Sequence, residues 1–70
     1  MIPVGSLVRD VDVGDIGIIV GPLVETKTVA NPIKTVRTQL VLWPSNQGMP
    51  FEMDLSAIES GWVEVLSEAR

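Results

Sequence analysis

Apolar and polar residues alternate in short runs along this 70-residue chain, and glycine or proline separates most of the runs. A period of two is the pattern of a half-buried β-strand. The chain also has 11 Val, 6 Ile and 4 Thr, residues that favour strands over helices. The pattern predicts five strands, over residues 6–9, 16–20 (running on towards Val24), 33–43, 50–54 and 62–66.

The segments between these runs predict turns, one helical turn and one long loop. The acidic stretch 10–15 and the stretch 44–48 have turn compositions. Residues 56–61 combine a capping serine, a short apolar run and a final glycine, which predicts a single helical turn before the last strand. The polar stretch from Glu25 to Pro32 predicts a loop that is long for a small hairpin.

Alternate positions within each strand are expected to face the core. In the longest strand one side carries Lys34, Val36, Thr38, Leu40 and Leu42. That side is apolar towards its end, so Leu40 and Leu42 are expected inside. The complete expected core is Val8, Ile16, Ile18, Val20, Leu40, Leu42, Met53, Ile58, Val63 and Val65.

Five short strands with one helical turn before the last strand form the layout of a small SH3-like barrel. The predicted fold class is therefore all-β, a five-stranded SH3-like barrel spanning residues 1–70 as one domain, with a long hairpin loop at 25–34. An OB-like barrel is the alternative, but that fold usually carries a fuller helix between its third and fourth strands.

The residue types that are missing exclude most catalytic chemistry. The chain contains no cysteine and no histidine, which rules out a thiol nucleophile, a histidine base and a metal site built on imidazole or thiolate. The remaining carboxylates, such as Asp54 and Glu59, have no sequence context that would suit acid–base catalysis or form a substrate cleft. We therefore expect a protein that is not an enzyme and has no cofactor.

Charge and hydropathy limit the partners. Nine acidic residues against five basic ones give a net charge of −4, which argues against binding along a nucleic-acid backbone. No apolar run approaches the length of a membrane span, and the first residues lack the basic region of a signal peptide. We expect synthesis in the cytoplasm, with no membrane and no nucleic acid as partner.

Two stretches resemble ligand-binding motifs but lack residues that those motifs require. Asp10, Asp12 and Asp15 resemble a calcium loop, but an EF-hand that starts at Asp10 would need an acidic residue at 14, a glycine at 15 and a glutamate at 21. The glycines of residues 14–21 do not lead into a helix or a Gly-Lys pair, as phosphate loops do. A solvated acidic turn and strand bulges explain these residues better.

Two groups of residues are candidates for contacts with a protein partner. Trp43, Pro44 and Trp62 lie at strand ends, where they either plug the barrel as core or form partly exposed anchors of the kind enriched in interfaces. Three of the five basic residues, Lys27, Lys34 and Arg37, gather on the long hairpin, where they form either a solvated face or a docking site for an acidic neighbour. A hairpin arm that adds a strand to a partner's sheet is a further possibility.

Several stretches resemble the small SH3-like barrel proteins of tailed bacteriophages. The similar stretches are residues 4–10 (VGSLVRD), 15–20 (DIGIIV), 41–43 (VLW) and 64–66 (EVL). The resemblance implies a phage-type origin and a barrel fold, and it carries over no catalytic residue. The chain departs from the common plan at Ser6, where the plan has an acidic residue, and in a longer loop at 25–34.

These observations together predict a non-enzymatic protein–protein interaction module. The expected role is a minor structural component of a tailed phage particle, in capsid decoration, neck or baseplate, with a larger virion protein or copies of itself as partner. The alternative is a free cytosolic regulator that binds a host protein. A third hypothesis, nucleic-acid binding through Lys27, Lys34 and Arg37, predicts retention on DNA or RNA at about 50 mM salt that is lost by about 200 mM.

Overall fold

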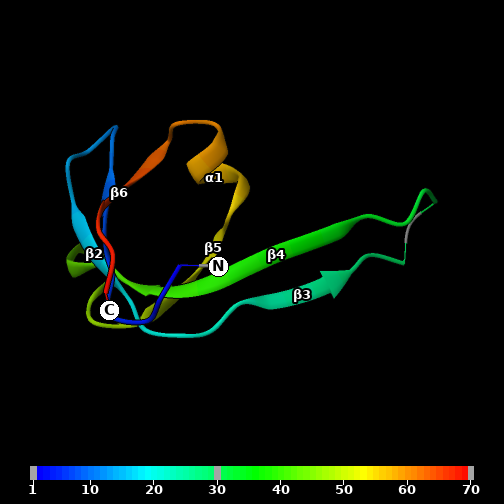
Figure 1. Ribbon diagram of the computed structural model, residues 1–70, viewed down its shortest axis with the longest axis horizontal. Helices are drawn as coiled ribbons and strands as arrows, with labels where there is room; N and C mark the ends of the chain where they lie inside the picture. Colours follow the sequence, from blue (N-terminus) through cyan, green and yellow to red (C-terminus); the bar gives the residue numbers. More distant parts are fainter. Residues whose placement is uncertain (1, 30, 70) are drawn as a thin grey trace.

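The computed structural model describes residues 2–29 and 31–69. It contains six strands, one 3₁₀ turn and one short α-helix (Figure 1). The elements are β1 (Leu7–Asp10), β2 (Ile16–Ile19), β3 (Val24–Lys27), β4 (Thr35–Leu42), η1 (Pro44–Asn46), β5 (Pro50–Asp54), α1 (Ser56–Glu59) and β6 (Val63–Ser67). The predicted all-β character is confirmed, as are the turn after the longest strand and the helical turn before the last.

All six strands belong to one antiparallel sheet in the order β3-β4-β2-β1-β6, with β5 on the other edge of β4. Among the described residues β6 pairs only with β1 and β5 only with β4, so the sheet curls without closing into a barrel. An ion pair between Arg9 and Glu64 joins β1 to β6 on the surface.

The number of strands differs from the sequence-based expectation. The segment 25–34 was expected to be a loop, but β3 forms over Val24–Lys27 and pairs with the first half of β4. The prediction failed because Glu25, Thr26 and Lys27 are polar on both faces, and a strand that is wholly exposed carries no alternation of hydrophobicity. The β3–β4 hairpin projects from the rest of the molecule as an arm (Figure 1).

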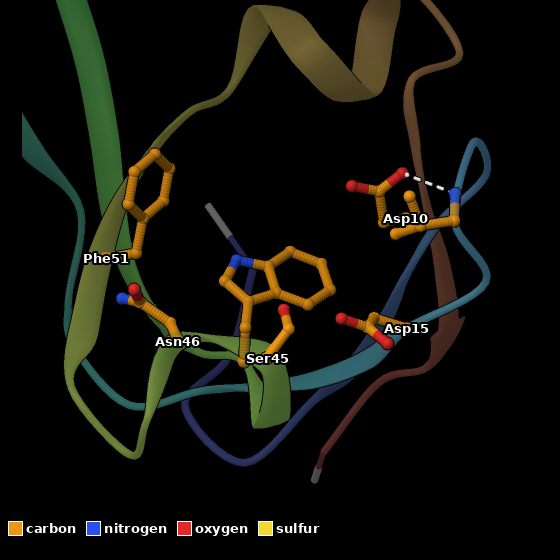
Figure 2. Close-up of a pocket in the computed structure, with 7 residues that line it drawn as sticks. Asp10, Asp15, Ser45, Asn46 and Phe51 are labelled. Carbon is orange, nitrogen blue, oxygen red and sulfur yellow. Dashed lines mark hydrogen bonds between the residues drawn. The ribbon is translucent and has the colours of Figure 1, made fainter.

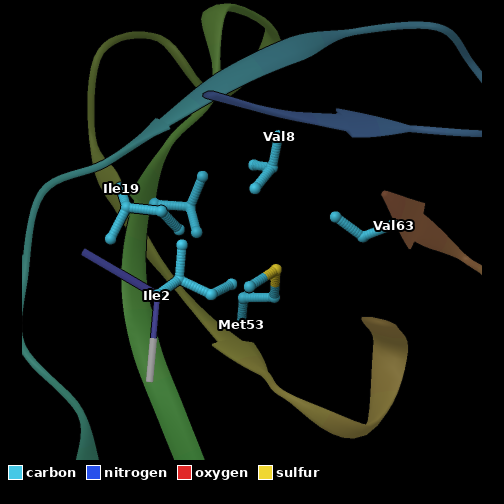
Figure 3. Packing of buried hydrophobic residues seen from close by; sticks show 6 residues of the cluster. Ile2, Val8, Ile19, Met53 and Val63 are labelled. Atoms are coloured by element: carbon cyan, nitrogen blue, oxygen red, sulfur yellow. The ribbon is translucent and has the colours of Figure 1, made fainter. Parts of the chain in front are cut away.

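The core is formed by six side chains that point towards one another, one from the N-terminal segment and one from each of β1, β2, β4, β5 and β6 (Figure 3). They are Ile2, Val8, Ile19, Val41, Met53 and Val63. Of the expected core residues, Val8, Met53 and Val63 are confirmed as buried, while Leu42, Ile58 and Val65 are only partly buried. The other four were assigned wrongly, since Ile16, Ile18, Val20 and Leu40 are exposed.

On β2 and β4 the face that turns inward is the opposite one to that predicted, so every inward position differs by one residue from the expected one. The inward positions are Gly17 and Ile19 on β2 and Gln39 and Val41 on β4. Gln39 is fully buried because its side chain binds the N-terminal segment. Its Oε1 accepts from the Ile2 N–H at 2.9 Å, and its Nε2 donates to the carbonyl oxygens of Ile2 at 2.7 Å and Gly21 at 3.1 Å.

Candidate functional site

The exposed face of the sheet is apolar, which is unusual because the solvated side of an antiparallel sheet normally carries polar residues. Leu7, Ile18 and Leu42 lie side by side across three neighbouring strands, since Leu7 pairs with Ile18 and Ile18 pairs with Leu42. Beside this row Val20 pairs with Leu40 through the Val20 N–H, which donates to the Leu40 carbonyl oxygen at 2.9 Å.

We call this surface the outer apolar face and define it as Leu7, Ile16, Ile18, Val20, Leu40 and Leu42. Five of the six are exposed, Ile16 to 50%, and Leu42 is half-buried. Within the described part of the chain, the charged residues next to it lie at its borders, where Arg9 is opposite Ile16 and pairs with Glu64, and Glu52 is opposite Leu40. The face is therefore a contiguous apolar surface with a charged rim.

One end of the outer apolar face is hollowed into a groove of about 350 Å³. Its lining is Leu7, Ile16, Gly17, Ile18, Leu42, Trp43, Pro44 and Gly48. Trp43 packs against the core, and the missing side chain of Gly17 leaves room for its indole ring. The groove accordingly has the composition of a pocket for an apolar side chain or turn.

The structure separates the three residues predicted at strand ends. Trp43 and Pro44 both line the apolar groove. Trp62, exposed to 66%, instead lines a different hollow of about 300 Å³ with Val11, Asp12, Ser60 and Gly61. Its main chain is fixed, because the Trp62 carbonyl oxygen accepts from the Val11 N–H at 3.0 Å. Trp43 and Trp62 therefore belong to different surfaces.

The predicted basic residues all lie on the arm, away from the outer apolar face. Arg37 is paired within the hairpin, since its Nε donates to Glu25 Oε1 at 3.0 Å and both side chains are exposed. Lys34 closes the arm through its main chain, with its N–H donating to Thr28 Oγ1 at 3.0 Å and its carbonyl oxygen accepting from the Thr28 N–H at 2.8 Å. Lys27 lies on β3 at the edge of the sheet.

The acidic turn borders a further hollow of about 250 Å³ (Figure 2). Asp10 and Asp15 lie on one side of it and Phe51 on the other, with Trp43, Ser45, Asn46 and Val13 completing the lining. Asp10 stabilises the turn, because its Oδ1 accepts from the N–H groups of Asp12 at 2.9 Å and Val13 at 3.3 Å. Carboxylates beside aromatic rings suit the cationic side chain of a Lys or Arg.

Within residues 2–29 and 31–69, no three His, Cys, Asp or Glu side chains come together where they could hold a metal ion. In the same part of the chain, neither helix has the length and hydrophobicity that crossing a membrane requires.

The sequence predicted Trp43 and Pro44 as contact residues, but it did not predict the outer apolar face. The signal was present, since residues 16–20 and 40–43 carry apolar side chains at both odd and even positions. A strand of that kind is apolar on both faces, and only one face can turn towards a small core. No protein-family model, curated protein or solved structure matches this chain.

Proposed function

We propose that this chain is a non-enzymatic protein–protein interaction module that docks a larger protein on its outer apolar face. The observation that carries the proposal is the uncharged row of exposed Leu7, exposed Ile18 and half-buried Leu42 on the side of the sheet that faces solvent. Contiguous exposed apolar surface with a polar rim is typical of protein interaction sites.

The energetics support the same conclusion. A chain of 70 residues buries a small core, and its folding free energy is correspondingly small. Covering apolar area contributes about 25 cal/mol per Å². A partner on the outer apolar face would therefore add stability that the isolated chain lacks, and the groove beside Trp43 and Pro44 offers a pocket for an anchoring side chain.

The setting that we propose is a tailed phage particle, where the chain would serve as a minor structural component in capsid decoration, neck or baseplate. The resemblance of residues 4–10 and 15–20 to small SH3-like phage proteins supports this setting. We also propose that the curled sheet, with α1 before β6, is a relative of the SH3-like barrel. The second candidate, a cytosolic regulator of a host protein, would use the same face.

Site-specific cross-linking separates these two settings. A photo-reactive amino acid at position 16 is expected to cross-link the chain to one larger virion protein in gradient-purified particles, because Ile16 is half exposed on the outer apolar face. Mass spectrometry of the cross-linked band identifies the partner. The matched control carries the same amino acid at position 4, where Val4 is 56% exposed but lies outside this face, and should give no band.

A charge introduced on the outer apolar face tests the same contact by weakening it. The Ile18→Glu variant is expected to lower incorporation into particles by about tenfold, because a buried unpaired carboxylate opposes docking. Val4→Glu should be incorporated normally, and circular dichroism confirms that both variants fold. Absence of the wild-type chain from purified particles would contradict the structural role, and a cross-link from position 16 to a host protein would favour the regulator.

A further inference from the structure

The open edge of β3 is a second surface with a specific chemistry. β3 stands at the end of the sheet order, and all four of its residues are exposed. It belongs to the arm, which projects from the molecule as a two-stranded ribbon (Figure 1). A two-stranded ribbon is only marginally stable in water, and an open edge presents unpaired main-chain groups to other strands.

The hydrogen-bond pattern of the arm shows which residues present those groups. Thr28 faces β4, because its N–H donates to the Lys34 carbonyl oxygen at 2.8 Å. Arg37 faces away from β3, because its carbonyl oxygen accepts from the Leu55 N–H at 2.9 Å. Glu25 is paired in register with Arg37, and orientation alternates along an antiparallel strand. Glu25 and Lys27 therefore direct their N–H and C=O groups to the open edge.

We propose that a second copy of this chain pairs with this edge, β3 against β3, antiparallel about a two-fold axis at Thr26. In this register Glu25 lies opposite Lys27 of the second copy, and the symmetry repeats the pair. Each such pair exchanges two main-chain hydrogen bonds and brings opposite charges together on one face of the sheet. The interaction does not depend on what the outer apolar face binds.

Charge selects this register over its neighbours. Hydrogen bonding requires that the outward-facing residues, Glu25 and Lys27, meet one another across the axis. A shift of two residues in one direction places Glu25 opposite Glu25, and a shift in the other direction places Lys27 opposite Lys27. Like charges directly opposite each other destabilise a sheet. Only the register centred on Thr26 makes both contacts attractive.

The intramolecular ion pair extends this charge pattern. Glu25 already contacts Arg37 at 3.0 Å on its β4 side. In the pair of copies Lys27 of the second chain would stand on its other side, so each carboxylate lies between two cations. Val24 and Thr26 point to the same side of the sheet as Leu40 and Leu42, because they pair with Thr38 and Val36. The two outer apolar faces would therefore share one side of a continuous sheet.

The contact is short, which predicts a weak and concentration-dependent dimer. Interfaces that bury less than about 1,200 Å² are typical of transient complexes. We expect the wild-type chain to shift from monomer to dimer between about 10 μM and 1 mM at low salt, measured by sedimentation velocity. A wild-type chain that stays monomeric over this range would overturn the proposal.

Two charge variants test the register itself. The Glu25→Lys variant presents Lys at both 25 and 27, and the Lys27→Glu variant presents Glu at both, so each is expected to self-associate about tenfold more weakly than wild type. Mixed in equal amounts, the two variants should form a heterodimer, because every pair across the axis is then Lys against Glu. Circular dichroism checks that each variant folds, since the exposed Glu25–Arg37 pair contributes little to the fold.

Matched controls distinguish this contact from the outer apolar face. Lys34→Glu makes the same charge change on the arm outside β3 and should leave the dimer intact, as should Ile18→Glu on the outer apolar face. Full self-association of either β3 variant, or failure of their mixture to associate, would overturn the proposal. Loss of the dimer in Ile18→Glu with no effect of the β3 variants would also overturn it, since the copies would then meet through the outer apolar face.

Discussion

Replacing Gln39 with methionine is expected to lower the free energy of unfolding by about 3 kcal/mol, because main-chain groups of Ile2 and Gly21 lose their partners. Methionine has nearly the same length and shape but forms no strong hydrogen bond. The N-terminal segment must then leave main-chain groups unsatisfied or detach and expose Ile2, which is part of the core. For a domain of this size the loss corresponds to a decrease in Tm of about 15 °C.

Urea or thermal unfolding followed by circular dichroism measures this effect. The matched control is Gln47→Met, which makes the same change at an exposed position after η1 and should alter stability by less than about 0.5 kcal/mol. Equal stabilities of the two variants would show that the hydrogen bonds of Gln39 do not hold the N-terminal segment in solution.

The second large effect is expected for Gly17→Ala, which should destabilise the protein by about 2 kcal/mol through overpacking. A Cβ atom at position 17 would lie 2.7 Å from Cε3 of Trp43 and 2.8 Å from Cγ1 of Val41. Neither neighbour can move easily, since Val41 is fully buried and the indole ring packs against the core. The near-ultraviolet circular dichroism of the tryptophans should change along with the denaturant midpoint.

Gly21→Ala is the matched control for this prediction. The added Cβ would approach atoms of Leu40 at 3.0 to 3.3 Å. Because these contacts are longer than those at position 17 and Leu40 lies at the exposed face, where the strand can shift by a few tenths of an ångström, we expect a cost below about 1 kcal/mol. A cost at position 17 no larger than at position 21 would mean that Trp43 does not occupy the space beside Gly17.

The local rules of the sequence predicted much of this fold. Glycine, proline and polar clusters marked the turns, and the alternation of Met53 on β5 and Val63 on β6 gave the correct inward face. In these strands one face is more apolar than the other, and burying that face is therefore favoured. The helical turn at Ser56–Glu59 followed from its serine and the glycine behind it.

The same rules failed where both faces of a strand are apolar or both are polar. On β2 the count of apolar residues favoured Ile16, Ile18 and Val20 as the inward set, and the structure turns Gly17 and Ile19 inward instead. On β3 all four residues are exposed and three of them are polar, so no periodicity marked a strand that exists through its pairing with β4. The outer apolar face was missed for the first reason. The second reason explains why the strand β3 itself was not predicted, although the sequence had suggested that the hairpin arm could add a strand to a partner's sheet.

By itself the sequence determined the extended segments other than β3, the positions of the turns, and that catalysis by cysteine or histidine is excluded. These properties depend on residue type and on neighbours along the chain. The tertiary structure alone decided which face of β2 and β4 is inside, because that choice depends on contacts between distant residues. Gly17 faces inward because the indole of Trp43 occupies the space beside it. Gln39 faces inward because its side chain forms hydrogen bonds with the main chain of Ile2. The apolar residues of β2 and β4 that therefore lie on the opposite face form the outer apolar face together with Leu7 of β1.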